Sequence, residues 1–314
     1  MPEPAIPVTI VTGFLGAGKS TLVQKWLEEL PRNETAVIVN ELGEVGIDGE
    51  LLAARVAFLR EITGGCVCCK TQAELSSALL ELSLLTPRPG RILIETSGAA
   101  SPVGVIRAVG APWARERLVL DGVITVIDVM RAQRALEFDV ALEQLGFADV
   151  VVLSHVDEAT EASGVALDAV QETLSRHAPA ATFVQSAQGA LASSFLELLG
   201  QRVDALHVVP EGSGHSSIEA ISLVLGEELD EELFGDWVES SLGNVEARIL
   251  RVKGILAMKG VDARVIVQGV SEAVEVVLGA PWGDTRRTSR LVVLGLGLDA
   301  AALEAGFLRC SAKD

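Results

Sequence analysis

Residues 8–21 read VTIVTGFLGAGKST, and this segment is the strongest indication of the fold. The β-branched residues at 8–12 are typical of a buried strand. They lead directly into the pattern G-x-x-x-x-G-K-[ST] at 13–20, and the amphipathic stretch 21–30 that follows is typical of a helix. A strand, a glycine-rich loop and a helix in this order form the context in which that pattern binds phosphate. The sequence therefore predicts a phosphate loop that holds a nucleotide.

Each residue type in the predicted phosphate loop has a physical reason to be there. Glycines let the backbone approach the phosphates, and the loop N–H groups, helped by the positive end of the following helix, point at the oxygens. Lys19 is expected to neutralise the β- and γ-phosphates, Ser20 to offer its hydroxyl to Mg²⁺, and Thr21 to lie beside the α-phosphate. The predicted nucleotide-binding residues of this loop are Gly13, Gly16, Ala17, Gly18, Lys19, Ser20 and Thr21.

Short aliphatic runs alternate with amphipathic stretches beyond the loop. The runs are 8–12, 36–40, 56–60, 91–95, 123–127, 149–153 and 182–185, and the amphipathic stretches include 21–30, 72–85 and 165–177. This alternation predicts an α/β domain with a doubly wound, mostly parallel sheet. Because sites in such sheets gather at the carboxyl ends of strands, further site residues are expected where the runs end.

A second, smaller domain is expected after a linker. Pro, Gly and Ser cluster in LHVVPEGSGHSS at 206–217, which is typical of a linker. Beyond it, strands are expected at 218–225, 246–258, 261–270, 272–278 and 291–296, and helices at 230–240 and 299–307. The sequence thus predicts a nucleotide-binding domain at 1–206, a linker at 207–217 and a C-terminal α+β domain at 218–314.

Charge and cysteine content narrow the classes of partner. The net charge of −18 repels phosphate backbones and anionic lipid, so neither nucleic acid nor a membrane surface is an expected partner. Residues 6–17 lack the basic start of a signal peptide, and no apolar run is long enough to predict a membrane span. Three of the four cysteines lie within four residues, which suits a reducing compartment better than a disulfide framework. We therefore expect a cytoplasmic protein.

The segment RILIETSGAASP at 91–102 is a second candidate for the phosphate side of the site. Glu95 ends a predicted strand, where an acidic residue can hold Mg²⁺ through water, and Gly98 can offer its N–H to the γ-phosphate. A carboxylate facing solvent is the alternative interpretation of Glu95. Lys19, Glu95 and Gly98 are the predicted catalytic residues, and Ser20 and Glu95 the predicted Mg²⁺ residues. Because Ala99 stands where a Gln or Arg could orient the attacking water, slow intrinsic hydrolysis is expected.

The loop after the run 149–153 indicates which nucleotide base the protein recognises. It reads Ser154-His155-Val156-Asp157, where GTP-binding proteins place N-K-x-D. In that pattern the Asp pairs with the N1–H and amino group of guanine. Asp157 is retained, Ser154 replaces the Asn, and His155 replaces the Lys, whose stem packs on the base and whose place the imidazole ring could take. GTP is therefore the predicted nucleotide, and a polar loop without this role is the alternative.

The sequence GGCVCC at 64–69 predicts a thiolate metal site. A capping-box pattern at 71–74 opens the predicted helix 72–85, so the thiols lie just ahead of a helix N-terminus, which lowers thiol pKa values. Thiolates favour zinc, cobalt or cuprous copper over magnesium. The candidate ligands are Cys66, Cys68 and Cys69, with carboxylates of NELGEVGID at 40–48 (Glu41, Glu44 and Asp48) available to complete a tetrahedral site.

Two other interpretations of the clustered cysteines stay open. They could be apolar fillers of a core, as free cysteines often are, or a redox switch. The fourth cysteine, Cys310, follows the last predicted helix and is expected in the core. Because the run 36–40 precedes the carboxylate segment, the thiolate site and the γ-phosphate are expected at the same edge of the sheet.

These motifs in this order resemble the CobW-type family of SIMIBI-class P-loop GTPases. The segments that carry the resemblance are GFLGAGKST (13–21), NELGEVGIDGELL (40–52), GGCVCC (64–69), IETSGAASP (94–102), VITVIDV (123–129), RVKGILAM (251–258) and TSRLVVLGLGLD (288–299). The resemblance implies a metallochaperone that couples GTP binding and hydrolysis to loading a metal and passing it to a client metalloprotein. It implies metal held by thiolates among Cys66, Cys68 and Cys69, with GTP and Mg²⁺ ordering the site. Zinc is the expected metal and cobalt the alternative.

The chain also departs from that family. Many members have a His-rich loop between the domains, but here only His207 and His215 stand in that region, and Val267 precedes Gln268 where members often have His. Metal storage by the second domain is therefore not expected. A nucleotide-dependent homodimer is a further expectation, and Arg286, Arg287 and Arg290 near Trp282 are either a basic docking patch for the client or a solvated strand end.

Two rival functions remain on the sequence alone. A P-loop kinase acting on a small metabolite would share the phosphate loop but would need an acceptor pocket and a general base, and would bind ATP. A thiol metal buffer or redox sensor without catalysis would share the cysteines but would not need Lys19.

Overall fold

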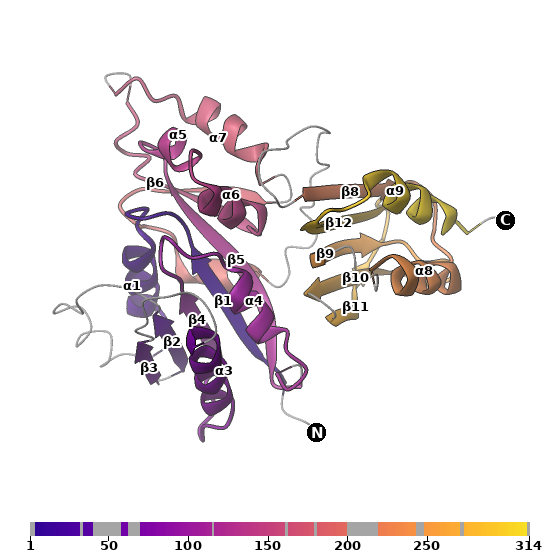
Figure 1. The fold of residues 1–314 in the computed structure, drawn as a ribbon, viewed down its shortest axis with the longest axis horizontal. Coiled ribbons are helices and arrows are strands. Elements are labelled where there is room, and N and C mark those ends of the chain that lie inside the picture. Colours follow the sequence, from indigo (N-terminus) through magenta and orange to yellow (C-terminus); the bar gives the residue numbers. More distant parts are fainter. Residues whose placement is uncertain are drawn as a thin grey trace. The chain divides into compact units, whose positions relative to one another are not determined.

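The chain forms two compact units, Met1–Gln201 and Arg202–Asp314, which are described one at a time. The structure is a computed structural model that describes residues 4–31, 34–39, 58–61, 70–114, 116–160, 163–178, 181–199, 219–242, 248–270 and 273–312. Figure 1 shows the course of both units. The predicted linker at 207–217 lies outside the described residues.

The first unit is built on a seven-stranded sheet in the order β3-β2-β4-β1-β5-β6-β7 (Figure 1). Every neighbouring pair in it is parallel, as the alternation of strands and helices predicted. Its strands are β1 (Ile6–Thr12), β2 (Thr35–Val39), β3 (Phe58–Glu61), β4 (Arg91–Glu95), β5 (Leu118–Asp128), β6 (Val150–Ser154) and β7 (Thr182–Ser186).

Helices cover both faces of this sheet. They are α1 (Lys19–Glu29), α3 (Lys70–Ser83), α4 (Val103–Val109), α5 (Ala132–Ala135), α6 (Asp139–Gly146), α7 (Leu167–Ser175) and the 3₁₀-helix η2 (Ser193–Leu198). Alternate residues of β6 belong to different cores: Val152 packs with α1 and η2, while Val151 and Leu153 pack with α5, α6 and α7. Burial on both faces explains why the strands read as continuous aliphatic runs.

Some predicted boundaries in the first unit are wrong. Helix α3 begins at Lys70 rather than at residue 72, and it ends at Ser83 rather than at residue 85. Strand β3 ends at Glu61, one residue beyond the end of the predicted run 56–60. The short helices α5 and α6 were not predicted, because neither is long enough to give a clear helical period.

The second unit is a five-stranded antiparallel sheet with helices, as the predicted α+β class requires. The strand order is β11-β10-β9-β12-β8, with every neighbouring pair antiparallel. The strands are β8 (Glu219–Leu225), β9 (Arg248–Leu256), β10 (Ala263–Val270), β11 (Ala273–Pro281) and β12 (Ser289–Leu296). The helices are α8 (Glu231–Trp237), the π-helix η4 (Val238–Leu242) and α9 (Ala300–Arg309).

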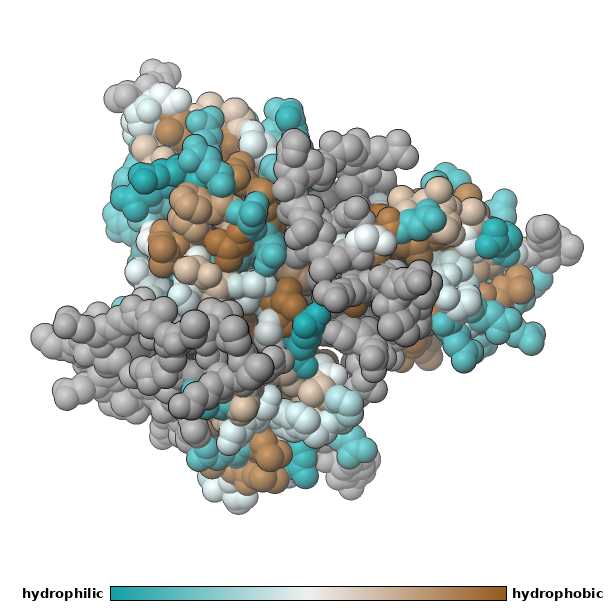
Figure 2. All heavy atoms as spheres, in the orientation of Figure 1, coloured by the Kyte–Doolittle hydropathy of each residue, from teal (hydrophilic) through white to brown (hydrophobic). Residues whose placement is uncertain are grey.

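The core of the second unit brings apolar side chains of β8, β9, β10 and β12 together with those of α8 and α9. The rings of Trp237 and Phe307 pack edge to face with centroids 5.5 Å apart, and Phe234 contacts both. On the face seen in Figure 2, hydrophilic and apolar side chains are interspersed over α8 and α9. The exposed Leu233 and Leu308 belong to these two helices, and scattered apolar exposure of this kind is ordinary on a protein surface.

Candidate nucleotide site

The phosphate loop between β1 and α1 needs its glycines. Gly13, Gly16 and Gly18 have φ angles of +137°, +76° and +95°. A residue with a side chain would be strained at such positive φ angles, whereas glycine is not. At Gly13 a Cβ atom would also lie 2.1 Å from the carbonyl oxygen of Val126 on β5. No side chain therefore fits at Gly13, and the loop backbone is held closely against the sheet.

The cationic side of the loop is already assembled. Lys19 is 8% exposed, and its ammonium donates a hydrogen bond to the carbonyl oxygen of Phe14, 3.3 Å away. Helix α1 begins at this lysine, and its first turn has no acidic residue, so its positive end is not neutralised from within. An anion in the loop would therefore face the lysine together with the helix N-terminus.

A hydroxyl and a carboxylate converge beside the loop. The hydroxyl of Ser20 donates a hydrogen bond to Oε1 of Glu95 at 2.6 Å. The parallel register of β1 and β4 pairs Val11 with Glu95, which brings the end of β4 next to the start of the phosphate loop. Glu95 is only 5% exposed, so the interpretation of this residue as a carboxylate facing solvent is wrong.

The segment after β4 touches the phosphate loop through Gly98. A Cβ atom on Gly98 would lie 2.6 Å from the backbone nitrogen of Leu15, so only glycine fits there. The fully buried Gln144 on α6 donates hydrogen bonds to the carbonyl oxygens of Gly98 (3.3 Å) and Ala100 (3.0 Å). Sequence reasoning missed Gln144, because its contact is with a loop that is distant in the sequence.

The loop after β6 is joined to the phosphate loop. The hydroxyl of Ser154 donates to the carbonyl oxygens of Ala17 at 2.7 Å and Ile127 at 3.2 Å. His155 has a φ of +57°, and its Nδ1 lies 3.1 Å from the Ser154 hydroxyl and 3.7 Å from Oδ1 of Asp128. Asp157 is exposed to solvent.

The loop after β7 completes this side of the site. Gly189 has a φ of +73°, and a Cβ atom there would lie 3.1 Å from the Thr21 methyl group of α1. The ammonium of Lys25 on α1 donates to the carbonyl oxygen of Gln188. The structure thus brings together the phosphate loop, the end of β4, the loop after β6 and the loop after β7 at the carboxyl ends of the strands.

The predicted metal-binding residues, Cys66, Cys68, Cys69, Glu41, Glu44 and Asp48, lie outside the described residues. Within the described residues, no group of three or more His, Cys, Asp or Glu side chains could hold a metal ion. The flanks of the predicted segments are described. Strand β2 ends at Val39, which pairs in register with Glu95, and α3 begins at Lys70, directly after Cys69 in the sequence.

The fourth cysteine is a core residue, as predicted. Cys310 is 2% exposed, and its thiol donates to the carbonyl oxygens of Leu233 and Gly306. Burial, the largest effect, raises the pKa of the Cys310 thiol above its usual 9.0. This thiol is therefore neutral and protonated in the folded protein.

In the region of the predicted basic patch, one arginine is already paired with carboxylates of the second unit. Arg287 forms ion pairs with Glu228 at 2.7 Å and Asp262 at 2.5 Å, so its charge is already neutralised. Trp282 is buried, with the guanidinium of Arg264 stacked over its ring at 5.0 Å from the centroid. Arg287 therefore serves the internal structure of the second unit, whereas Arg286 and Arg290 are exposed, and a docking role for these two stays a prediction.

The fold and the site define the chain as a P-loop GTPase. The CobW/HypB/UreG nucleotide-binding domain model matches residues 7–185, and the model of the cobalamin synthesis protein CobW C-terminal domain matches residues 218–311. Because the first match alone covers more than half of the chain, this protein belongs to the CobW family of P-loop GTPases.

Named relatives and a solved structure span nearly the whole chain. The zinc chaperone YjiA of Escherichia coli K12 is 32% identical, over 96% of this chain and 98% of that protein. The zinc chaperone CobW of a Sinorhizobium species is 30% identical, over 96% of each chain. The crystal structure of Zn(II)-bound YjiA GTPase from E. coli has a TM-score of 0.70 at 26% identity, and covers 99% of this chain and all of that one.

None of the helices in the described part of the chain is both long enough and apolar enough to cross a membrane.

Proposed function

We propose that this GTPase is a cytoplasmic zinc chaperone that loads its metal in a GTP-dependent manner and passes it to a client metalloprotein. The observation that carries the proposal is the register of two strands. Val39, the last described residue before Glu41 and Asp48, lies opposite Glu95, whose carboxylate contacts Ser20 in the phosphate loop. A metal site built from that segment would begin beside the γ-phosphate position. The names of the relatives support zinc as the cargo.

Guanine is recognised by Asp157, whose exposed carboxylate would accept from the N1–H and amino group of the base. Ser154 holds this loop on the phosphate loop, and the imidazole of His155 would cover the base in place of a lysine stem. Contacts to the phosphates come from Lys19 and from the backbone of Gly13, Gly16, Ala17, Gly18, Ser20 and Thr21.

Mg²⁺ fits the oxygen pair beside the loop. The Ser20 hydroxyl and the Glu95 carboxylate are hard oxygen donors that already lie 2.6 Å apart, and such donors suit Mg²⁺. Ser20 would hold the ion directly and Glu95 through water. When bound, the ion neutralises charge on the β- and γ-phosphate oxygens.

The chain's own residues then position the nucleotide for hydrolysis. Lys19 binds the β- and γ-phosphate oxygens, and the N–H of Gly98 donates to a γ-phosphate oxygen. Gln144 holds the Gly98 segment in place through the carbonyl oxygens of Gly98 and Ala100. Because Ala99 cannot orient water, the intrinsic rate is expected to be slow.

Metal loading is coupled to the nucleotide in this proposal. GTP orders the Glu41–Asp48 and Cys66–Cys69 segments into a tight site, and hydrolysis loosens it for transfer. Linkage requires zinc to tighten GTP binding by the same factor by which GTP tightens zinc binding. For the metal site to change from almost empty to almost fully loaded, the affinities for metal in the two nucleotide states must differ by about 10⁴-fold. A GTP-dependent homodimer that shields the loaded metal is part of the same proposal.

The metal arm is tested by anaerobic titration with Zn²⁺ and with Co²⁺, in the presence of GTP, of GDP or of no nucleotide. We expect far tighter metal binding with GTP, and sulfur-to-cobalt absorption bands that disappear in Cys66→Ala and Cys68→Ala. Cys310→Ala is the matched control and should keep the bands, because that thiol is buried in the core of the second unit. Equal metal affinity in all three nucleotide states would overturn the coupling.

The base arm is tested by nucleotide competition. Asp157→Asn should lose GTP affinity by about two orders of magnitude, since two charge-assisted hydrogen bonds are lost, and should gain affinity for xanthosine triphosphate, whose C2 oxygen accepts from the new amide. Glu158→Gln, the adjacent exposed carboxylate, is the control. ATP binding as tight as GTP binding, or label from the γ-phosphate on a small metabolite, would favour the kinase interpretation instead.

A further inference from the structure

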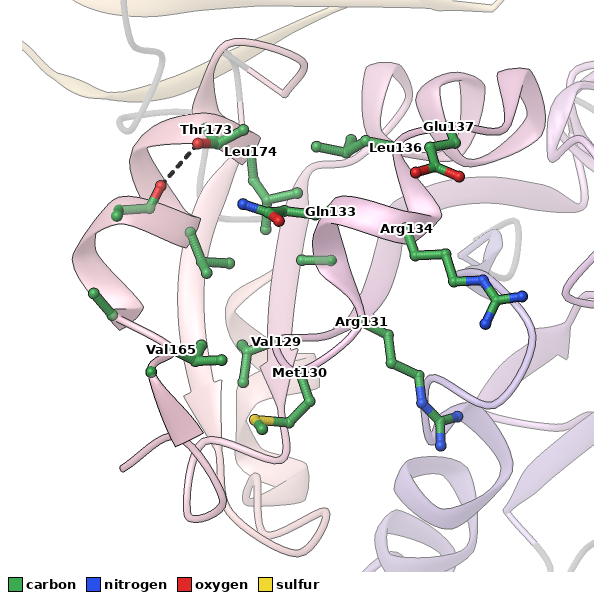
Figure 3. A pocket seen from close by; sticks show the side chains of 15 residues that line it. Val129, Met130, Arg131, Gln133, Arg134, Leu136, Glu137, Val165, Thr173 and Leu174 are labelled. Carbon is green, nitrogen blue, oxygen red and sulfur yellow. Dashed lines mark hydrogen bonds between the residues drawn. The ribbon is translucent and has the colours of Figure 1, made fainter. Parts of the chain in front are cut away.

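The guanidinium of Arg131 lies against the phosphate loop. Its Nη1 is 3.3 Å from the point where a Cβ atom would stand on Gly16, so nothing separates the guanidinium from the backbone of the loop. Arg131 precedes α5, just beyond the end of β5. Figure 3 shows its side chain extending away from α7, toward the pale indigo ribbon of the N-terminal segment.

Within the part of the chain that the structure describes, the guanidinium of Arg131 is paired at its Nε end. Its Nε lies 3.6 Å from Oδ2 of Asp128, and Oδ1 of the same carboxylate accepts a hydrogen bond from the N–H of Met130 at 2.9 Å. Asp128 is therefore fixed by backbone, while the arginine side chain remains 70% exposed. Across the described ranges, Asp128 is the one carboxylate that pairs with Arg131. The N–H donors of the two Nη groups are therefore available to bind another anion. A planar guanidinium matches the geometry of phosphate oxygens, to which it can donate two parallel hydrogen bonds.

We propose that Arg131 is a catalytic residue of the GTPase reaction, which binds phosphate oxygens of GTP from the outer side of the phosphate loop. During hydrolysis, the bond between Pγ and the β–γ bridging oxygen breaks as the bond from Pγ to the water oxygen forms. Negative charge moves onto the bridging oxygen of the departing GDP, and the two water protons pass to the released phosphate and to solvent. A guanidinium at that oxygen stabilises the charge as it develops.

The rest of the site has no residue at position 99 that could assist the attacking water, and Arg131 would supply catalytic help from another position. Ala99 occupies the position at which other GTPases carry a residue that assists the water. An arginine supplied by the same chain would raise the intrinsic rate without a partner protein. The need for cationic help is large, because the chain has a net charge of −18 and GTP adds several more negative charges.

The experiment compares Arg131→Ala, Arg131→Lys and the control Arg134→Ala, which removes the same charge one turn further on. The readouts are single-turnover GTP hydrolysis, affinity for GDP and GTP, and formation of the GDP–aluminium fluoride complex that mimics the transferring phosphoryl group. We expect Arg131→Ala to slow hydrolysis about 30-fold, the order by which an arginine in cis raises GTPase rates, while GDP affinity changes less than about threefold. Arg131→Lys should be intermediate, because it keeps charge but loses the planar fork.

The complex with aluminium fluoride separates catalysis from structure. Wild type and Arg134→Ala should form it, and Arg131→Ala should not. A hydrolysis rate in Arg131→Ala within about twofold of wild type, or equal losses in Arg131→Ala and Arg134→Ala, would overturn the inference, since equal losses would reflect net charge alone. Absence of GTP hydrolysis in the wild-type chain would overturn the GTPase assignment together with this inference.

Discussion

The hydroxyl of Ser154 donates a 2.7 Å hydrogen bond to the carbonyl oxygen of Ala17. This contact joins the loop that faces the base to the loop that faces the phosphates, across 137 positions of sequence. Serine is shorter than the Asn usual at this position, and the contact forms because β6 delivers its last residue directly beside the phosphate loop. The two halves of the nucleotide site are therefore mechanically coupled.

Ser154→Ala should weaken GDP and GTP binding alike, by about fivefold, because one hydrogen bond contributes ~1 kcal/mol. Titration with a fluorescent guanine nucleotide measures the effect. Ser175→Ala, which removes an exposed hydroxyl bonded within α7, is the control and should bind as wild type does. Loss of GTP binding alone, with GDP unaffected, would contradict a role shared by both nucleotides.

Gly98→Ala should slow GTP hydrolysis about 10–100-fold, because its Cβ would overlap the Leu15 backbone and displace the segment from the phosphate loop. GTP affinity should fall more than GDP affinity, since this segment faces the γ-phosphate. Gly104→Ala is the matched control: it lies in α4 with open space around the added methyl, and should leave hydrolysis unchanged. Equal rates in the two variants would show that the close approach has no catalytic consequence.

Gly306→Ala should destabilise the second unit by about 1–3 kcal/mol, the usual cost of overpacking. Its Cβ would lie 2.3 Å from Nε1 of Trp237, which is itself packed against Phe307. Urea denaturation followed by tryptophan fluorescence measures the change. Gly235→Ala in α8, where the methyl meets open space, should instead gain ~0.5–1 kcal/mol from helix propensity. Similar stabilities for both variants would rule out the steric argument.

The contact between Glu29 and Ser193 predicts a pH dependence of stability. The backbone N–H of Ser193 donates to Oε2 of Glu29 at 2.6 Å, and this hydrogen bond lowers the pKa of Glu29 below its usual 4.5. The folded state therefore favours the ionised carboxylate, so the stabilisation is fully present above the unfolded pKa and is lost as the pH falls through the lower folded pKa.

The measurement compares wild type with Glu29→Gln by urea denaturation between about pH 3.5 and 7. The stability difference should be largest near neutrality and should shrink below pH 4.5. Glu304→Gln, an exposed carboxylate on α9, is the control. A difference that grows as the pH falls has the wrong sign and would refute the assignment.

Much of the site could be predicted from sequence because its residues lie in short segments with strict local geometry. The phosphate loop requires positive φ angles at Gly16 and Gly18, and only a pattern such as GFLGAGKS supplies them. The ends of the aliphatic runs located Glu95 and Asp157 at the carboxyl edge of the sheet. Gln144 and Arg131 were missed, because each acts on a loop that is distant in sequence, and no local period reports such a contact.

The alternation of strands and helices, the phosphate loop and the family could all be recognised from the order of residues, since they depend on patterns within about 20 residues or on the order of motifs along the chain. Which side chains meet could be known only from the arrangement of the strands in space. Strand order β4-β1-β5-β6 sets the pairing of Glu95 with Ser20, of Ser154 with Ala17, and of Arg131 with Gly16. The order of strands arises from the packing of the whole sheet, and so it depends on contacts between segments that are far apart in the sequence. Local sequence patterns do not report such contacts.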